Sequence, residues 1–587
     1  MNRGKMTLNH GQNQPTVELG AKSSKPKSLE RVDTGASASS STSVVGSLAS
    51  GKTNDTAFLD ELDTKKTGIQ GADVDHACGE AATMTSSVAD PPRDPSLTCF
   101  SPSFWPQLLK FLGPGFLVAT GYIDPGNLSA DINQGVQAGY QLTWVTLYST
   151  VIGLLVQIVA ARLGVITGRH LAQHGRAEYP PFARILVWGI TELGIIATDM
   201  IEVMGGAVAF SALTNGALPL WAGVLITGIG SFFLLGLEHW GMRLLEFLLM
   251  SLIALMAITF GYMFFSTGVD YGAVAKGLFV PHLNSNTINL AVGAVGAIIT
   301  PHNLYLHSAL VLTHGEALRA TTHGQAMRYV STEASLALFT ALGINIFVIA
   351  VFAHLFSSGS SSSLAGAVGL GNAGQALASA QGKQMQYIWG VGLLAAAFAS
   401  TVTSTYAGQV VMTAYLGVKV SAWWRTAAVR LFTLGPTLSV ALLVHTETAL
   451  TGWTEVLNII QSLVLPFVVI PLLTFTSSTK IMGQHVNRLW AVIALSSVLV
   501  ALLGLNGYLV VTFAIRQLPA WGWARALFSL ACILYATFVA YLLAGPVRVH
   551  SAVRYGIDKL VARWRKPEVT ELVECCQVND VVPAGEC

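Results

Sequence analysis

One stretch of the sequence decides the fold: residues 291–312 read AVGAVGAIITPHNLYLHSALVL. The stretch is long and apolar enough to cross a bilayer as a helix, and its Gly and Ala residues allow a close helix neighbour. Pro301 removes a backbone donor and clashes with the preceding turn, so the helix is predicted to break there. A broken helix at membrane depth is tolerated only where it is buried or lines a cavity. Thr300, His302 and His307 beside the break therefore mark a candidate ion or substrate site.

The composition indicates a membrane protein with many spans. Of 587 residues, 52% are hydrophobic and only 11% are charged, whereas a soluble chain carries about 25% charge. The net charge of +2 gives no support for nucleic-acid binding. The six cysteines form no CxxC pair, so we expect neither a disulfide framework nor a zinc site. Cys575 and Cys576 are interpreted as free thiols, with palmitoylation as the alternative.

About twelve apolar segments follow one another, each roughly 20 residues or longer, as membrane helices require. They cover residues 108–135, 142–165, 184–213, 218–237, 244–266, 288–312, 332–356, 385–413, 428–447, 453–475, 488–512 and 523–545. Residues 104–545 are therefore predicted to form one transmembrane transporter domain. Residues 1–103 are polar and are expected to be a disordered N-terminal tail, and residues 546–587 a polar C-terminal tail.

The charge of the loops predicts the orientation. One set of loops is basic and should face the cytosol, because Lys and Arg accumulate on that side. It carries Arg162, Arg169, Arg176, Arg184, Arg319, Arg328, Lys419, Arg425, Lys480 and Arg488. With an even number of spans, both tails are then cytosolic. On the other side, residues 357–363 and the Gly/Ala/Ser stretch after them are expected to form a flexible outer loop.

The first span contains a second predicted break, at Asp124-Pro125-Gly126-Asn127. The two breaks are five spans apart, which is the pattern of a five-plus-five inverted repeat with the site between them. Asp124, Asn127 and the carbonyls freed by the breaks supply oxygen ligands that suit a cation. The alternative is that each break is only a structural kink.

A third feature is a stripe of acids in one apolar helix. Asp199 and Glu202 lie seven and ten positions after Glu192, which places the three on one side of a helix. Buried carboxylates need partners, water or exchangeable protons, so a proton relay to the cytosol is predicted. Arg425 and Arg430 are the candidate partners. Alternatively, the stripe is a helix interface held by ion pairs, and both interpretations can hold together.

His302 and His307 are the other titratable groups predicted within the bilayer. Imidazole changes charge near physiological pH and can also bind metals. Beside the break, proton handling or gating is favoured over direct ligation.

Four stretches together resemble the natural resistance-associated macrophage protein (Nramp) family of proton-coupled divalent-metal transporters. They are GPGFLVATGYIDPGN with QAGYQLTWV, ITELGIIATDMIEVMGGAVAF, TPHNLYLHSALV, and ASTVTSTYAGQVVM. The match runs from about residue 105 to residue 482. The resemblance implies an all-α, polytopic LeuT-type fold in which helices 1 and 6 are broken.

The resemblance also implies roles for individual residues. The implied metal ligands are Asp124, Asn127, Gln461 and the backbone carbonyls of Gly121 and Ala297. The implied proton pathway comprises Asp124, His302, Glu192, Asp199 and Glu202, with Arg430 and Arg425 opposite. Asn345 resembles a polar residue near the same path, beside the gating candidate His307.

Thr300 departs from the family pattern, which has methionine at this ligand position. A thioether is soft and favours Mn²⁺ and Fe²⁺ over Mg²⁺ and Ca²⁺. We therefore expect a site for Mn²⁺ and Fe²⁺ with relaxed rejection of Mg²⁺, and a hard-cation transporter of the same fold is the alternative.

The predicted function is proton-coupled metal symport toward the cytosol by alternating access, with no resident cofactor. An amino-acid transporter of the same fold is disfavoured, because such sites use Gly-rich breaks without an acidic ligand. A signalling relative would carry a large C-terminal domain, and an enzyme would need a nucleophile–base set or cofactor motif. Plasma, endosomal and vacuolar membranes all remain open.

Overall fold

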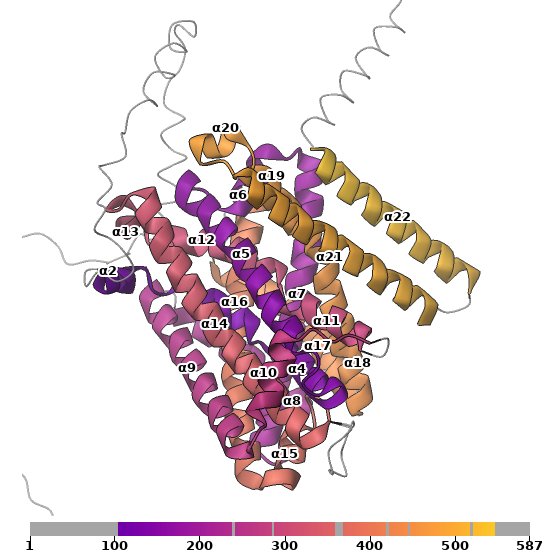
Figure 1. The fold of residues 1–587 in the computed structure, drawn as a ribbon. Helices are drawn as coiled ribbons and strands as arrows, with labels where there is room; N and C mark the ends of the chain where they lie inside the picture. Colours follow the sequence, from indigo (N-terminus) through magenta and orange to yellow (C-terminus); the bar gives the residue numbers. More distant parts are fainter. Residues whose placement is uncertain are drawn as a thin grey trace, which may run out of the picture. The chain divides into compact units, whose positions relative to one another are not determined.

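The computed structural model describes residues 104–237, 241–284, 287–357, 368–417, 422–443, 446–516 and 521–545. These ranges are helical, with turns and connecting segments but no strand (Figure 1). The two predicted tails, residues 1–103 and 546–587, lie outside the described residues.

Each predicted apolar segment falls on one helix or on consecutive shorter helices. The unbroken ones are α5 (Thr143–Thr167), α7 (Pro181–Leu213), α8 (Leu220–Leu235), α9 (Met242–Thr267), α14 (His323–Phe356), α16 (Lys383–Leu416), α17 (Ala422–Leu443), α21 (Leu489–Arg516) and α22 (Gly522–Ala544). The tenth segment is divided into α18 (Glu447–Val464) and α19 (Pro466–Thr476). The predicted polytopic all-α fold is thus confirmed.

Both predicted breaks are present. The first segment consists of α3 (Pro114–Ala119), the 3₁₀ turn η1 (Thr120–Tyr122) and α4 (Pro125–Ala138). The sixth consists of α11 (Ile288–Ile298) and α12 (Pro301–Thr313). In each case the second half begins at a proline, where the ring fixes φ and the missing N–H costs no helical bond.

Two predictions were wrong: where the first span begins, and that the Gly/Ala/Ser stretch is entirely a loop. The first span does not begin at residue 108, because residues up to 111 form a separate helix, α2 (Phe104–Phe111). Gly113, with φ +141°, separates α2 from α3 in a conformation that favours glycine. On the opposite side, the Gly/Ala/Ser stretch is not all loop, because it contains α15 (Ala373–Gln381). Residues 358–367 of that loop lie outside the described ranges.

Short helices connect the spans: α6 (Leu171–Glu178), α10 (Tyr271–Phe279), α13 (Gly315–Arg319) and α20 (Thr479–Met482). In the bundle, α16 packs along α7, and α14 packs on α4, α5 and α9 (Figure 1). Helices α21 and α22 both contact α19, and α21 also contacts α18 and α11. The two helices leave apolar residues such as Val500 and Leu527 exposed, as expected of surfaces that face lipid.

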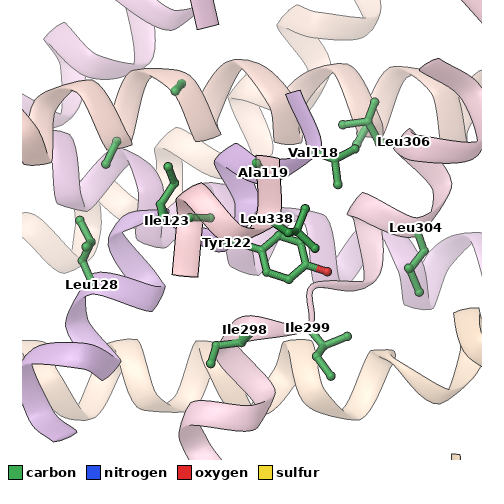
Figure 2. Close-up of a cluster of buried hydrophobic side chains, with 14 of the residues drawn as sticks. Val118, Ala119, Tyr122, Ile123, Leu128, Ile298, Ile299, Leu304, Leu306 and Leu338 are labelled. Carbon is green, nitrogen blue, oxygen red and sulfur yellow. The ribbon is translucent and has the colours of Figure 1, made fainter. Parts of the chain in front are cut away.

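The two breaks lie in one buried apolar cluster. Figure 2 shows Tyr122 and Ile123 of the first break with Ile298 and Ile299 of the second, and all four are at most 1% exposed. Polar groups at the breaks are therefore surrounded by packed side chains, where unpaired oxygens are costly unless they serve a ligand.

Candidate metal centre

The two breaks share one backbone design. Asp124 and Thr300 each stand directly before a proline and cap the helix that follows, in extended conformations with ψ of 166° and 132°. The proline ring itself imposes this, because it disfavours the helical region for the preceding residue. The sequence thus places one oxygen-bearing side chain at the same point of each break.

Proline also frees one carbonyl in each break. In a helix, a carbonyl accepts from the N–H four residues later. For Gly121 that residue is Pro125, and for Ala297 it is Pro301, and neither proline has an N–H. The two backbone carbonyls assigned to the metal by resemblance are therefore the two that the prolines deprive of their helical donors.

Asp124 and Asn127 form a tight pair at the start of α4. Asp124 Oδ1 accepts from the Asn127 backbone N–H at 2.7 Å and from Asn127 Nδ2 at 2.8 Å. Asn127 Nδ2 also donates to the Gly121 carbonyl at 3.2 Å. Both side chains are buried, and Asn127 Oδ1 has no hydrogen-bond partner among the described residues.

Thr300 pairs with a residue whose place in the site the sequence analysis missed. Asn303 Nδ2 donates to Thr300 Oγ1 at 2.7 Å, and Asn303 Oδ1 is buried without a partner in the described part of the chain. The spacing of three residues across Pro301 gives a signal for Asn303, since positions i and i+3 share a helix face.

Helix α18 brings a third set of amides. Gln461 Nε2 donates to Asn458 Oδ1 at 3.3 Å, and Gln461 Oε1 is buried and unpaired within the described ranges. Asn458 lies beside the first break, because a Cβ on Gly126 would be 3.4 Å from both Asn458 Oδ1 and Asp124 Oδ1. The sequence analysis missed Asn458 as well, although it precedes Gln461 by three positions.

Asn345 of α14 reaches the first break from another side. Its Nδ2 donates to the Tyr122 carbonyl at 2.8 Å, and its Oδ1 is buried without a described partner. This bond satisfies a carbonyl of η1, two residues before Asp124.

The donor set is therefore made of oxygens. Four amide oxygens, on the broken helices or on helices that contact them, are buried without partners among the described residues: those of Asn127, Asn303, Asn345 and Gln461. Within the described ranges no three His, Cys, Asp or Glu side chains could together hold a metal ion. A cation here would depend on Asp124 and neutral oxygens, a set that suits hard and borderline ions.

The acids of α7 lie against α16 and α17. Arg430 Nη1 donates to Asp199 Oδ1 and Oδ2 at 2.7 and 2.8 Å, and Arg430 Nη2 donates to the Thr401 carbonyl at 3.0 Å. Ser404 donates to Glu202 Oε2 at 2.6 Å. Asp199 and Glu202 are both 0% exposed, and Glu202 Oε1 has no partner among the described side chains.

The same stretch of α7 contacts the first break. Gly205 leaves room for the Pro125 ring, since a Cβ there would collide with it, and Ile201 lies beside Gly126. Glu202 stands between these two positions in the sequence, and the Ser404 hydroxyl that donates to it also lies 3.4 Å from Asp199 Oδ1. Asp124, Glu202 and Asp199 thus form a series of acids from the break to Arg430.

Glu192 is more peripheral than the other two acids. It is half-buried near Gly408 of α16, and its Oε2 has no partner in the described part of the chain. Arg425 was the second predicted partner of the three acids, and its side chain lies outside the described residues.

The two histidines of α12 differ in their contacts. His302 is buried, and neither ring nitrogen has a partner among the described residues. His307 Nδ1 lies 3.2 Å from Gln157 Oε1, and Gln157 Nε2 donates to the Tyr122 hydroxyl at 3.5 Å. His307 is therefore linked to the first break through α5, whereas His302 makes no such contact within the described residues.

Comparison with known proteins decides the family. The natural resistance-associated macrophage protein-like family matches residues 115–512. The chain belongs to this family. It is 42% identical to the metal transporter nramp1 homolog of Dictyostelium discoideum, over 76% of this chain and 82% of that protein. It is also 42% identical to the metal transporter Nramp3 of Arabidopsis thaliana, over 76% of this chain and 87% of that protein.

A solved structure supports the same conclusion. The manganese transporter of Eremococcus coleocola, in complex with an aromatic bis-isothiourea substituted compound, matches with a TM-score of 0.65 and 27% identity, over 80% of this chain and 99% of that chain. The likeness to this manganese transporter confirms the fold class predicted from the sequence. As a member of the family, the chain is a multi-pass membrane transporter rather than an enzyme.

Proposed function

We propose that this protein carries divalent metal cations, Mn²⁺ and Fe²⁺ among them, toward the cytosol by alternating access, with protons moving in the same direction. The observation that carries the proposal is the oxygen set at the two breaks, with Asp124 at its centre. The family's named members are metal transporters, and a solved relative is a manganese transporter.

The ligands proposed for the metal are Asp124, Asn127, Thr300, Gln461 and the carbonyls of Gly121 and Ala297. Two prolines and the paired amides support this assignment. Binding would exchange the Asn127 Nδ2 bond to Gly121 for a metal–oxygen contact, because a cation and an N–H donor cannot share that lone-pair direction.

The protons are proposed to move along α7. A dication beside Asp124 favours the ionised form of neighbouring acids, so its arrival displaces a proton toward Glu202 and Asp199. Arg430 keeps Asp199 paired, while Glu202 has an open oxygen to accept the proton. His302, Glu192, Arg425 and His307 are proposed to assist along this path and at its gates.

One specific observation favours a second substrate class. Thr300 supplies a hydroxyl where the resemblance implies a thioether, and the unpaired groups around it are amide oxygens. Oxygen ligands suit Mg²⁺, so Mg²⁺ is the alternative cargo on the same path.

The basic loops support an orientation with both tails in the cytosol. The membrane is proposed to be the plasma membrane or an endosomal or vacuolar one, because an acidic outer compartment would drive influx in either setting.

Purified protein in liposomes tests the function. Vesicles carry a metal-sensitive dye inside and receive Mn²⁺, Fe²⁺, Mg²⁺ or Ca²⁺ outside, with and without an inward proton gradient. We expect Mn²⁺ and Fe²⁺ uptake that rises with the gradient and acidifies the lumen. No uptake of any of these ions would contradict the proposal, and uptake without lumen acidification would contradict the coupling.

A further inference from the structure

A second cluster of charged and titratable side chains, buried except for Arg243, lies where α3, α9, α14 and the end of α12 meet. Its charged or titratable members are Arg243, Glu246, His314 and Glu333. Glu246 and Glu333 are 1% and 0% exposed. Buried carboxylates within a membrane bundle are costly unless they are paired, so two in one place call for a specific role.

Glu333 of α14 binds the backbone at the start of α3. Its Oε1 accepts from the Gly113 N–H at 2.7 Å and from the Gly115 N–H at 3.0 Å. Glu246 of α9 lies on the other side of the same turn, since a Cβ on Gly113 would collide with its carboxylate. The two acids therefore hold one glycine turn between two helices that lie alongside each other (Figure 1).

Arg243 and His314 complete the link. Arg243 donates to the Leu112 carbonyl at 2.7 Å, to the Lys110 carbonyl at 2.7 Å and to Glu246 Oε2 at 3.1 Å. Glu246 Oε1 lies 3.0 Å from His314 Nε2, at the end of α12. The cluster thus joins α3, which precedes the first break, to the end of α12, which follows the second.

Resting on the transport function proposed above, we infer that Glu333, Glu246 and His314 are positioning residues that latch α3 against α9, α14 and the end of α12. In an inverted repeat, α3 and α12 are the half-helices on the same side of the site. Alternating access requires that side to open, and α3 moves only when the bonds to Gly113 and Gly115 are released.

Glu246, Glu333 and His314 are buried, whereas the Arg243 side chain is 59% exposed. Lys110 and Arg328 are exposed, and the Tyr329 hydroxyl donates to Gln107.

Two further atoms of the cluster, Glu333 Oε2 and His314 Nδ1, have no partner among the described residues. Removing the Glu333 carboxylate would leave the Gly113 and Gly115 N–H groups buried without their acceptor, which destabilises the closed latch.

A cysteine reporter tests the latch without metal or transport. Val118 of α3 is 0% exposed, so Val118→Cys in full-length protein, with the native cysteines replaced by serine, reacts with a maleimide only when α3 moves. Glu333→Ala should raise the reaction rate about tenfold, as expected when hydrogen bonds to a charged group are lost. Leu336→Ala, at a position on α14 that is 49% exposed, is the matched control.

Conservative variants separate the latch from general loosening. Glu333→Gln keeps an oxygen acceptor for both amides and should restore the slow rate. His314→Ala removes the contact with Glu246 Oε1 and should also raise the reaction rate.

Two outcomes would overturn the inference: a wild-type rate in monodisperse Glu333→Ala, or a rate in Glu333→Gln as fast as in Glu333→Ala. These readouts do not depend on transport, so a protein that passes no metal yet shows them would refute only the proposed function.

Discussion

Asn303 occupies the space that a side chain at Gly121 would need. A Cβ on Gly121 would collide with the Asn303 amide nitrogen, and the amide carbon and oxygen would lie 2.9 and 3.0 Å away. The two residues belong to different breaks, so the first and second broken helices are in direct contact at the candidate metal centre. The Asn303 amide that contacts Gly121 is the same one that donates to Thr300 Oγ1.

Gly121→Ala should therefore strongly reduce the rate of metal transport, although the substitution adds only one methyl group. The added methyl must displace Asn303 or the first break, and overpacking of this kind costs about 1–3 kcal/mol. We expect metal uptake in liposomes to fall on the order of tenfold or more, in proportion to that cost. Gly293→Ala is the control, because a Cβ there meets nothing within 4 Å. Equal uptake by the two variants would show that the contact is dispensable.

Asp124→Asn should abolish metal binding while leaving the fold intact. The amide retains an oxygen for the Asn127 backbone N–H, but the only carboxylate among the proposed ligands is lost, and a dication needs that charge. Isothermal titration with Mn²⁺ should show no saturable binding, and uptake should fall to background. Asp270→Asn, at the exposed N-cap of α10, should behave as wild type. Wild-type Mn²⁺ affinity in Asp124→Asn would refute the site.

The positions of the two helix breaks could be predicted from the sequence, because each break is caused by a proline within it. Pro125 and Pro301 end their helices through bonded geometry, and this alone locates the two freed carbonyls. Asn303 and Asn458 could not be assigned in the same way, because their roles depend on contacts between helices distant in the chain. The turn at Gly113 was missed because only its contacts with Glu246 and Glu333 reveal why it is there.

Arg430→Met should destabilise the protein strongly. It leaves Asp199 buried and unpaired, and breaking a buried ion pair by removing one partner costs about 3–5 kcal/mol. The double variant Arg430→Met with Asp199→Asn removes both charges and should recover much of that loss. The thermal unfolding midpoints of the wild type, the two single variants and the double variant measure this loss and recovery of stability.

The same cycle distinguishes structure from proton movement. If Asp199 serves only as a partner for Arg430, the double variant should regain proton-coupled uptake together with its stability. We expect it to regain stability but not coupling, because the acid series then ends at Glu202. Recovery of gradient-dependent uptake in the double variant would contradict a relay through Asp199.

Thr300→Met should narrow the metal selectivity. Thr300 Oγ1 now accepts from Asn303 Nδ2 and presents oxygen to the centre, whereas a thioether is a soft ligand that disfavours Mg²⁺ and Ca²⁺. The substitution frees the Asn303 amide, so some loss of stability is expected as well. Mg²⁺ should inhibit Mn²⁺ uptake about tenfold less well in the variant than in the wild type, since the soft ligand acts against the hard ion alone.

The control is Thr340→Met on α14, where the hydroxyl donates only to the Leu336 carbonyl of its own helix in the described structure. Competition assays over a range of Mg²⁺ concentrations at fixed Mn²⁺ give the inhibition constants directly. If wild-type protein already excludes Mg²⁺ at millimolar excess, the hydroxyl at position 300 does not relax selectivity. The rejection of hard ions must then come from the geometry of Asp124, Asn127 and the two freed carbonyls, which force a coordination that Mg²⁺, with its strict octahedral demand, cannot accept.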